Sequence, residues 1–186
     1  MSSRIAVNYR NGNTLFYLEQ LSSSTLLDDF SCSIVEYNDY LFKDATRSLK
    51  DHISLTWLLR ERKSGKIAAY MSLITDAIKL SLSEKVLHNL NYPFNTLPAI
   101  KVAKLAVSQS AQEKYKGLGT YMINKALAFA HICNRQLCAA RFLTVDADIE
   151  HDKGVLAFYE KNGFLPNAEL SNKNRKTISM RKDLYK

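Results

Sequence analysis

The chain has 186 residues, of which 46% are hydrophobic and 24% charged, a composition typical of one globular domain. No apolar run approaches the roughly 18–20 residues that cross a membrane, and the N-terminus lacks the apolar core of a secretory signal. Three cysteines, an odd count, suggest no disulfide framework, so we expect a reducing cytoplasm. The net charge of +8 favours a polyanionic partner, nucleic acid or a phosphate-rich cofactor; a basic surface that only aids solubility is an equal alternative.

The N-terminal half predicts a polar turn, a helix and a hairpin. Residues 8–13 are polar and turn-like. Residues 33–48 carry apolar side chains at helical spacing and predict an amphipathic helix. Residues 53–60 are rich in β-branched and aromatic side chains and predict a strand, which the turn at 63–66 joins to a returning strand over 67–74.

The middle of the chain predicts a short helix over 83–90 and a loop with two prolines over 91–98. Residues 99–107 predict a strand that is buried on both faces except at Lys101 and Lys104, and residues 108–116 predict a polar loop.

The last part predicts a helix over 120–134, a strand over 142–145, a helix over 152–162 that Gly163 ends, and a last strand over 177–184. Strands that alternate with helices predict an α/β or α+β sandwich with a parallel step in its middle. We expect one domain over residues 1–186.

Glycines mark the first chemical motif, Lys114-Tyr115-Lys116-Gly117-Leu118-Gly119-Thr120, which lies between a predicted strand and a predicted helix. Glycines let the backbone turn freely and approach a ligand. Backbone N–H groups at such a turn, together with the helix dipole, bind anions. The motif is not a Walker loop, because no Gly-Lys-Ser/Thr follows, and a dinucleotide fingerprint would need a glycine at Met122. Asp146 could supply that fingerprint's acidic residue, which leaves dinucleotide binding open.

The second motif is the aromatic run Phe158-Tyr159-Glu160-Lys161-Asn162-Gly163-Phe164 on the helix that follows the next strand. Tyr159 has two interpretations. A tyrosine on a helix is more often a core aromatic. The functional alternative is a general acid that protonates a leaving thiolate. A neutral tyrosine suits this task, because the pKa values of the tyrosine hydroxyl and of the thiol both lie above neutrality.

Together, in this order and at this separation, the two motifs resemble the GNAT acyltransferase superfamily over about residues 99–166. The resemblance implies a GNAT fold: a mixed central sheet with helices on both faces, and a splayed pair of parallel strands that holds acetyl-CoA as co-substrate. It divides the chain into an acceptor-side half (1–98), an acetyl-CoA-binding core (99–166) and a C-terminal strand or tail (167–186).

The resemblance also implies roles for individual residues. The backbone of Leu105, Ala106 and Val107 would pair with the pantetheine arm, and an N–H near Leu105 would polarise the thioester carbonyl. Tyr159 would protonate the departing sulfur. The implied cofactor-binding residues are Leu105, Ala106, Val107, Lys114, Lys116, Gly117, Leu118, Gly119, Thr120 and Phe158. Two features depart from the family pattern: Lys114 replaces the usual Gln or Arg, and the loop over 108–113 is longer than usual.

A looser resemblance covers the N-terminal half. The segments Tyr37-Asn38-Asp39-Tyr40-Leu41 and Gly65-Lys66-Ile67-Ala68-Ala69-Tyr70 are similar to those of the GNAT branch that includes tRNA-acetylating toxins, with Ala69 in place of a glycine. That branch acetylates the amino group of aminoacyl-tRNA and is inhibited by a partner antitoxin. Dimers are common in the family, although the sequence shows no interface.

A catalytic carboxylate is absent from the strand before Leu105, where Lys101 and Lys104 stand instead. Asp146, Asp148, Glu36 or Asp39 could supply one from elsewhere, although each is more often a capping or surface residue. His131, Cys133 and Cys138 match no zinc spacing, so we expect no metal site.

The sequence therefore predicts an N-acetyltransferase in which an amine attacks acetyl-CoA directly in a ternary complex. The acceptor is aminoacyl-tRNA or, alternatively, a small molecule or a protein amine. Two non-catalytic alternatives remain: a module that binds CoA or nucleic acid without turnover, and one half of a toxin–antitoxin complex.

Overall fold

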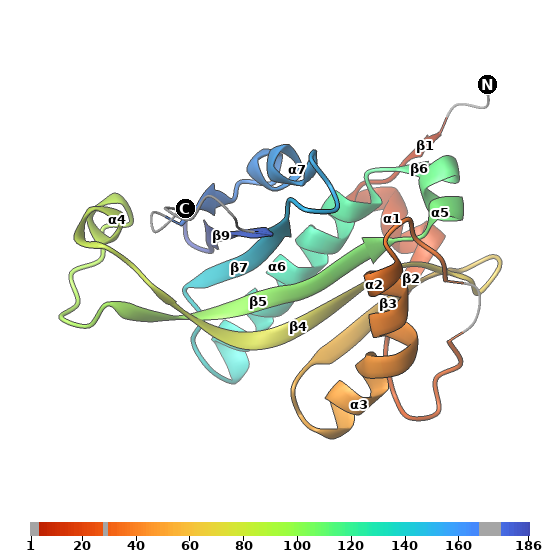
Figure 1. Cartoon of the computed structure of the whole chain (residues 1–186), viewed down its shortest axis with the longest axis horizontal. Coiled ribbons are helices and arrows are strands. Elements are labelled where there is room, and N and C mark those ends of the chain that lie inside the picture. Colours follow the sequence, from red (N-terminus) through yellow and green to blue (C-terminus); the bar gives the residue numbers. More distant parts are fainter. Residues whose placement is uncertain (1–3, 28–29, 168–175) are drawn as a thin grey trace. The chain divides into compact units, whose positions relative to one another are not determined.

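A computed structural model describes residues 4–27, 30–167 and 176–186 (Figure 1). It contains both helices and strands, and among the described residues no helix has the length and apolar content to span a membrane. The elements are β1 (Ile5–Ala6), α1 (Tyr9–Leu15), β2 (Phe16–Gln20), α2 (Val35–Asp39), a π-helical segment η1 (Tyr40–Asp44), α3 (Ala45–Lys50), β3 (Leu55–Glu61), β4 (Ile67–Lys79), α4 (Leu82–Leu87), β5 (Thr96–Val107), α5 (Gln109–Lys114), β6 (Tyr115–Lys116), α6 (Leu118–Gln136), β7 (Phe142–Asp148), α7 (Val155–Lys161), β8 (Leu165–Pro166) and β9 (Thr177–Asp183).

The strands form a mixed sheet in the order β2-β3-β4-β5-β7-β9-β8, and β1 pairs separately with β6. The expected parallel step is confirmed: β5 pairs parallel with β7 over Ala99–Val102 and Phe142–Val145, whereas β3–β4 and β7–β9 are antiparallel. The chain divides into two compact units, residues 1–74 with 103–126 and residues 75–102 with 127–186.

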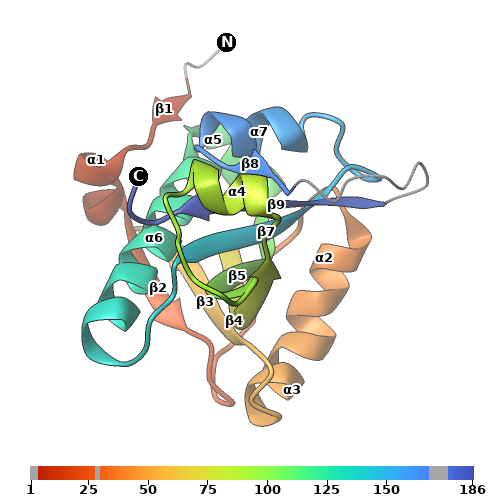
Figure 2. The ribbon, with the colours of Figure 1, turned by 90° about the vertical axis from the view of Figure 1, so that its left-hand side faces the viewer.

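In the first unit, α1 lies on one face of β2–β4 and the helical segment 35–50 on the other (Figure 2). The predicted amphipathic helix is confirmed, since Leu41 and Ala45 on its apolar stripe are fully buried. They join a core that includes Leu58, Ile67 and Tyr70 of the hairpin.

Two polar segments of this unit are helical where we expected none. Residues 8–13 begin α1, because Asn8 and Asn11 form a reciprocal capping box that satisfies the first N–H groups of the helix. Residues 108–116 contain α5 and β6 rather than a loop. The Ser108 hydroxyl accepts the N–H of Ala111 and so caps α5.

In the second unit, β7 lies between β5 and β9, and α7 ends as expected at Gly163. Gly163 has φ +83° and donates to Glu160 O, while Phe164 donates to Tyr159 O, which together form a Schellman motif. The predicted strand 99–107 is confirmed, but its burial is not, because Ala103 is exposed.

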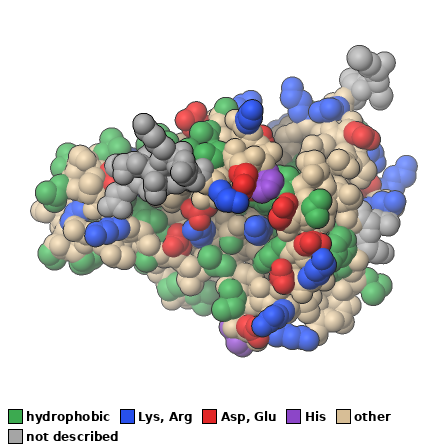
Figure 3. Space-filling view, in the orientation of Figure 1, with side chains coloured by type: hydrophobic (Ala, Val, Ile, Leu, Met, Phe, Trp, Pro, Cys, Tyr) green, Lys and Arg blue, Asp and Glu red, His purple; other side chains and the backbone are tan. Residues whose placement is uncertain are grey.

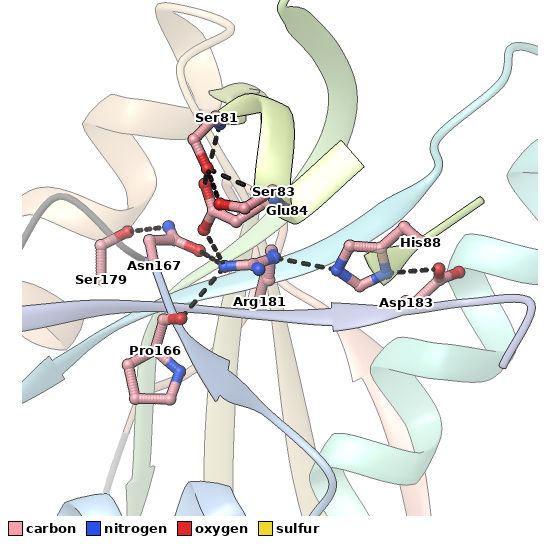
Figure 4. Close-up of polar contacts among 9 residues, drawn as sticks. All are labelled: Ser81, Ser83, Glu84, His88, Pro166, Asn167, Ser179, Arg181 and Asp183. Atoms are coloured by element: carbon pink, nitrogen blue, oxygen red, sulfur yellow. Dashed lines mark hydrogen bonds and ion pairs between the residues drawn. The ribbon is translucent and has the colours of Figure 1, made fainter. Parts of the chain in front are cut away.

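A buried ionic network joins α4 to β9 in this unit (Figure 4). Arg181, 2% exposed, lies 2.7 Å from the Glu84 carboxylate and donates from Nε to His88 Nε2 at 3.1 Å. His88 therefore donates from Nδ1 to Asp183, at 2.8 Å. Burial lowers the pKa of His88, which agrees with a neutral ring between these two partners.

Gly117 joins β6 to α6 in the first unit and is fixed by the N-terminal strand. The parallel pairing places Ile5 beside Tyr115, and Val7 N donates to Lys116 O at 2.7 Å. Gly117 has φ +95°, and a Cβ there would lie 2.9 Å from Val7 O. The position therefore requires glycine for two reasons, a left-handed backbone and a close backbone neighbour.

We predict that Gly117→Ala lowers the free energy of unfolding by about 1–3 kcal/mol, because alanine must keep a strained φ and also displace Val7. Urea unfolding followed by circular dichroism measures this loss. Gly65→Ala is the matched control: Gly65 has φ +72°, but nothing lies within 4 Å of its added Cβ. An equal loss in the two variants would show that the Val7 contact contributes nothing.

Candidate functional site

The glycine motif lies where strand β5 leads, through α5 and β6, into the start of the 19-residue helix α6. Ser108 N donates to Ala68 O at 2.9 Å, which fixes the end of β5 against the start of β4. Helix α6 begins at Leu118, directly after the Gly117 turn. The first N–H groups of an α-helix have no partner within the helix, and together with its dipole they favour an anion.

A hollow of about 240 Å³ adjoins this turn. Its lining includes five residues of the stretch 115–119, the end of β5 at Val107, and two residues that the sequence did not suggest, Arg4 and Gln112. Arg4 reaches the hollow because β1 pairs with β6. Arg4 and Lys116 give the lining two cationic side chains, both exposed.

Lys114 is not among the residues that line this hollow, although the motif places it among the cofactor-binding positions. Its ammonium is bound by the carboxylate of Glu61, at the end of β3, and the Tyr115 hydroxyl donates to the same carboxylate. Although burial raises the pKa of Glu61, the hydrogen bonds from Lys114, Ser64 and Tyr115 lower it to about 2. Lys114 is therefore held in an ion pair across the first unit.

A larger hollow of about 400 Å³ lies beside the β3–β4 turn and is also lined by a cation, Arg60. The Arg60 guanidinium already lies 2.5 Å from the Glu19 carboxylate and donates to Gly65 O and Leu26 O. Its charge is therefore used within the fold, and we consider the hollow at the glycine turn the stronger candidate for an anionic ligand.

The residues that we expect to pair with a pantetheine arm lie at the end of strand β5. Its pairing with β7 covers Ala99–Val102, and the strand continues to Val107. Within the predicted stretch, Ala106 is buried in the core of the first unit, whereas Leu105 and Val107 are half-buried. The carboxamide of Gln112 donates to Val107 O at 3.0 Å and so contacts the end of the strand.

Tyr159 lies on α7 in the second unit and is 7% exposed. Its ring packs edge-on against Phe158 and Phe164, with centroids 5.0 and 5.4 Å apart. The ring therefore packs as the core-aromatic interpretation expects. The general-acid interpretation concerns only the hydroxyl group. Phe158 is half-buried beside it.

Of the four carboxylates that we considered as bases, Asp146 and Asp39 pair with lysines and Asp148 contacts the His151 ring, whereas Glu36 lies exposed in the first turn of α2. Asp146 lies 2.5 Å from Lys101, Asp148 lies 3.0 Å from His151, and Asp39 lies 2.9 Å from Lys43. Lys101 stands on β5, where we looked for a catalytic carboxylate. It pairs instead with the carboxylate of Asp146. A fixed carboxylate that is already paired is a weaker base than a free one, because the cation favours its ionised form.

The cysteine-containing trio is not assembled as a metal site. Cys133 Sγ and Cys138 Sγ are 3.4 Å apart, and the ring of His131 lies against Tyr185 instead. Within the described part of the chain, the one group of three potential ligands within reach of one ion is Asp148, Glu150 and His151, two of which are exposed. Exposed groups of this kind are common surface features.

Comparison with solved structures identifies the fold of this chain. No family model matches the sequence, and no curated protein matches it. Among solved structures, a tyrosine-to-phenylalanine variant of KacT matches with a TM-score of 0.72 at 16% identity, over 90% of this chain and 95% of that one.

Two structures of AtaT match similarly. AtaT complexed with acetyl-methionyl-tRNAfMet has a TM-score of 0.68 at 18% identity, over 88% of this chain and 93% of that one. A tyrosine-to-phenylalanine variant of the AtaT toxin, bound to the C-terminus of the antitoxin AtaR and to acetyl-CoA, has a TM-score of 0.66 at 17% identity, over 89% and 92%. Identities this low show the fold alone, and the chain therefore adopts the GNAT fold that these toxins share.

Proposed function

We propose that this chain is an acetyl-CoA-dependent N-acetyltransferase. The observation that carries the proposal is the hollow at the Gly117 turn, where the start of α6 and the cations Arg4 and Lys116 converge. Backbone N–H groups at a helix N-terminus bind phosphate groups, and nearby cations add to the attraction. The acetyl-CoA complex of AtaT, which has the same fold, supports this choice of ligand.

In this proposal, the backbone N–H groups of Lys116–Thr120 hold the pyrophosphate, and the side chains of Lys116 and Arg4 neutralise its charge. Residues Leu105–Val107 hydrogen-bond the pantetheine arm, and Phe158 contacts the cofactor. Lys114, held by Glu61, acts mainly by positioning β6. This assignment keeps the expected cofactor-binding residues except Lys114 and adds Arg4, which lies near the motif only in the folded chain.

The proposed reaction is direct. The lone pair of the acceptor amine forms a bond to the thioester carbon, and an N–H near Leu105 stabilises the oxyanion that results. Collapse of this intermediate breaks the C–S bond, and Tyr159 gives its proton to the departing thiolate. The amine loses a proton to water, after which Tyr159 regains one from solvent. No covalent enzyme intermediate is involved.

We propose aminoacyl-tRNA as the acceptor. The α-amine of an amino acid has a pKa near 8, against about 10.4 for a lysine side chain, so at neutral pH far more of it is already unprotonated. A strong base is then unnecessary, which suits a chain in which the candidate carboxylates Asp146 and Asp39 are paired with lysines. The tRNA complex of AtaT supports this choice.

Charge supports the same acceptor more weakly. The net charge of +8 attracts nucleic acid. On the face shown in Figure 3, however, basic side chains are interspersed with acidic ones and form no continuous patch. A small amine or a protein amine remains the alternative acceptor. Because AtaT is bound to the antitoxin AtaR, we also propose an antitoxin as a protein partner of this chain.

We predict that acetyl groups pass from labelled acetyl-CoA to charged tRNA, that the label is lost on deacylation, and that added salt weakens the reaction steeply, because phosphate contacts release counterions. Scintillation counting of precipitated tRNA measures the transfer. Small amines and peptides are assayed in parallel. Label on these alone would exclude the tRNA acceptor but keep the acetyltransferase, whereas no label on any acceptor would favour a module that binds without turnover.

We predict that Tyr159→Phe lowers kcat by about 10²–10⁴-fold, because general acid catalysis contributes that much. Binding of acetyl-CoA, measured by isothermal titration calorimetry, should stay nearly unchanged, since the ring and its packing are kept. Tyr92→Phe, at a tyrosine that is 52% exposed, is the control for loss of a hydroxyl. Unchanged turnover in Tyr159→Phe would exclude the general acid role.

We predict that Arg4→Ala weakens acetyl-CoA binding about tenfold, which corresponds to one charge-assisted contact with a phosphate group. Binding of acetyl-pantetheine, which has no nucleotide phosphates, should not change. Arg10→Ala, at an exposed arginine of the same unit, controls for the loss of charge. If all three proteins bind acetyl-CoA equally, Arg4 does not contact the phosphates.

A further inference from the structure

The C-terminal end of α6 brings two cysteine side chains into contact. Cys133 and Cys138 stand five residues apart in the chain, and their sulfur atoms are 3.4 Å apart. The Cys133 thiol also lies 3.4 Å from Cys138 O. Cys133 is half-buried and Cys138 is exposed, so small molecules in solution can reach the pair. The acetyl transfer proposed above uses neither thiol.

The backbone holds the two cysteines together. Cys133 O accepts the N–H groups of Leu137 and Cys138, at 2.9 and 3.1 Å, so the chain folds back directly after the helix. A disulfide needs two Cα atoms no more than about 7 Å apart, and residues joined by a backbone hydrogen bond lie within that distance. From 3.4 Å, the sulfur atoms must approach by only about 1.4 Å to reach the length of an S–S bond.

The segment after Cys138 is fixed to the helix as well. The Asn134 carboxamide donates to Ala140 O at 2.8 Å and accepts the N–H of Ala140 at 2.5 Å. The same carboxamide donates to the Tyr185 hydroxyl at 2.9 Å. The connection from α6 to β7 (Figure 1) therefore keeps its place, and an S–S bond can form by rotation of the two side chains.

The third cysteine, Cys32, has a different environment. It belongs to the first unit, where its thiol donates to Ile34 O at 3.3 Å and its side chain packs against the apolar core. Burial raises the pKa of Cys32. A half-buried thiol that keeps its proton reacts slowly, so Cys32 is an internal reference for the other two.

We propose that Cys133 and Cys138 form a reversible redox site, which a low-molecular-weight disulfide of the glutathione class oxidises to an intramolecular disulfide. The thiolate of exposed Cys138 attacks one sulfur of the oxidant, whose S–S bond breaks to release one small thiolate. The Cys133 thiolate then attacks the Cys138 sulfur of this mixed disulfide and expels the second small thiolate. Two protein thiols are oxidised, and the protons that they lose convert the two small thiolates to thiols.

The geometry favours the second step, because Cys133 is held in contact with the sulfur that it attacks. Its effective concentration there exceeds that of a free thiol in solution. Contact with Cys133 raises the pKa of the Cys138 thiol, so at neutral pH the first step is slow and needs a raised concentration of oxidant. Exposed disulfides are also the easily reduced ones. In a reducing compartment the pair therefore rests as two thiols.

Oxidation acts on the end of α6. The disulfide closes a covalent ring over residues 133–138 and ties the end of the helix to the connection that leads into β7. Such a short ring removes little freedom from the unfolded chain. The main effect is therefore local: the end of a helix opens more easily than its middle, and the disulfide prevents this opening.

The test is a peptide map of the folded full-length chain after treatment with oxidised glutathione near the ordinary pKa of a cysteine thiol, about 8.5. Arg135 lies between the two cysteines, so trypsin separates them into peptides 126–135 and 136–141. We expect mass spectrometry to find these peptides linked, at about 2 Da below the sum of their masses. After denaturation, the thiols that iodoacetamide labels should fall from three to one. Reduced glutathione at about millimolar concentration should restore all three.

Cys138→Ser should abolish the linked peptides, whereas Cys32→Ser, the matched control, should keep them. Amide hydrogen exchange over residues 133–138 should slow about tenfold in the oxidised chain and stay unchanged in oxidised Cys138→Ser. Glutathione adducts that persist on both cysteines, or linked peptides found only between two chains on a non-reducing gel, would overturn the proposal. A disulfide that resists reduced glutathione would be structural, and unchanged amide exchange would mean that the bond has no effect on the helix; either result contradicts a reversible site that acts on α6.

Discussion

The candidate site depends on the backbone course of β5. Over four residues this strand is held by parallel hydrogen bonds to β7, and it then continues to Val107 in the other compact unit. Parallel strands need a long crossover, and here the crossover is α5, β6 and α6. The point where β5 ends therefore determines where the Gly117 turn lies and where the free N–H groups of α6 begin.

Much of this arrangement can be predicted from local sequence, because it depends on local chemistry. A helix period, a hairpin turn at Gly65 and a helix end at Gly163 each follow from a few adjacent residues. The helix α1 was missed because its cap is made by Asn8 and Asn11 rather than by a Ser or Thr followed by Glu. Helix α5 was missed because it is short and polar, although Ser108 was a signal for its start.

Other features depend on contacts between distant residues and leave no local signal. Arg4 lines the same hollow as Lys116 only because β1 pairs with β6, more than a hundred residues later. The orientation of α4 is a second case. Its sequence predicts a short helix but not which face is buried, because the partners of Glu84 and His88 lie on β9. Apolar side chains alone would have predicted the opposite face, because the leucine and valine side chains of this helix are exposed.

In the proposed site, the cationic charge that the motif places at Lys114 comes from another residue. Where the resembling family has a glutamine or arginine, this chain has a lysine whose charge is used by Glu61 within the fold. Although burial raises the pKa of Glu61, hydrogen bonds including that from Lys114 lower it to about 2, so the carboxylate stays ionised and the pair persists at neutral pH.

A cation that remains paired cannot also neutralise a phosphate at full strength. If the hollow binds the phosphates as proposed, charge comes from another source, because the N-terminal strand that fixes Gly117 also brings Arg4 to the lining. Structure and charge at this site thus come from the same segment, which a comparison of motifs alone would not include.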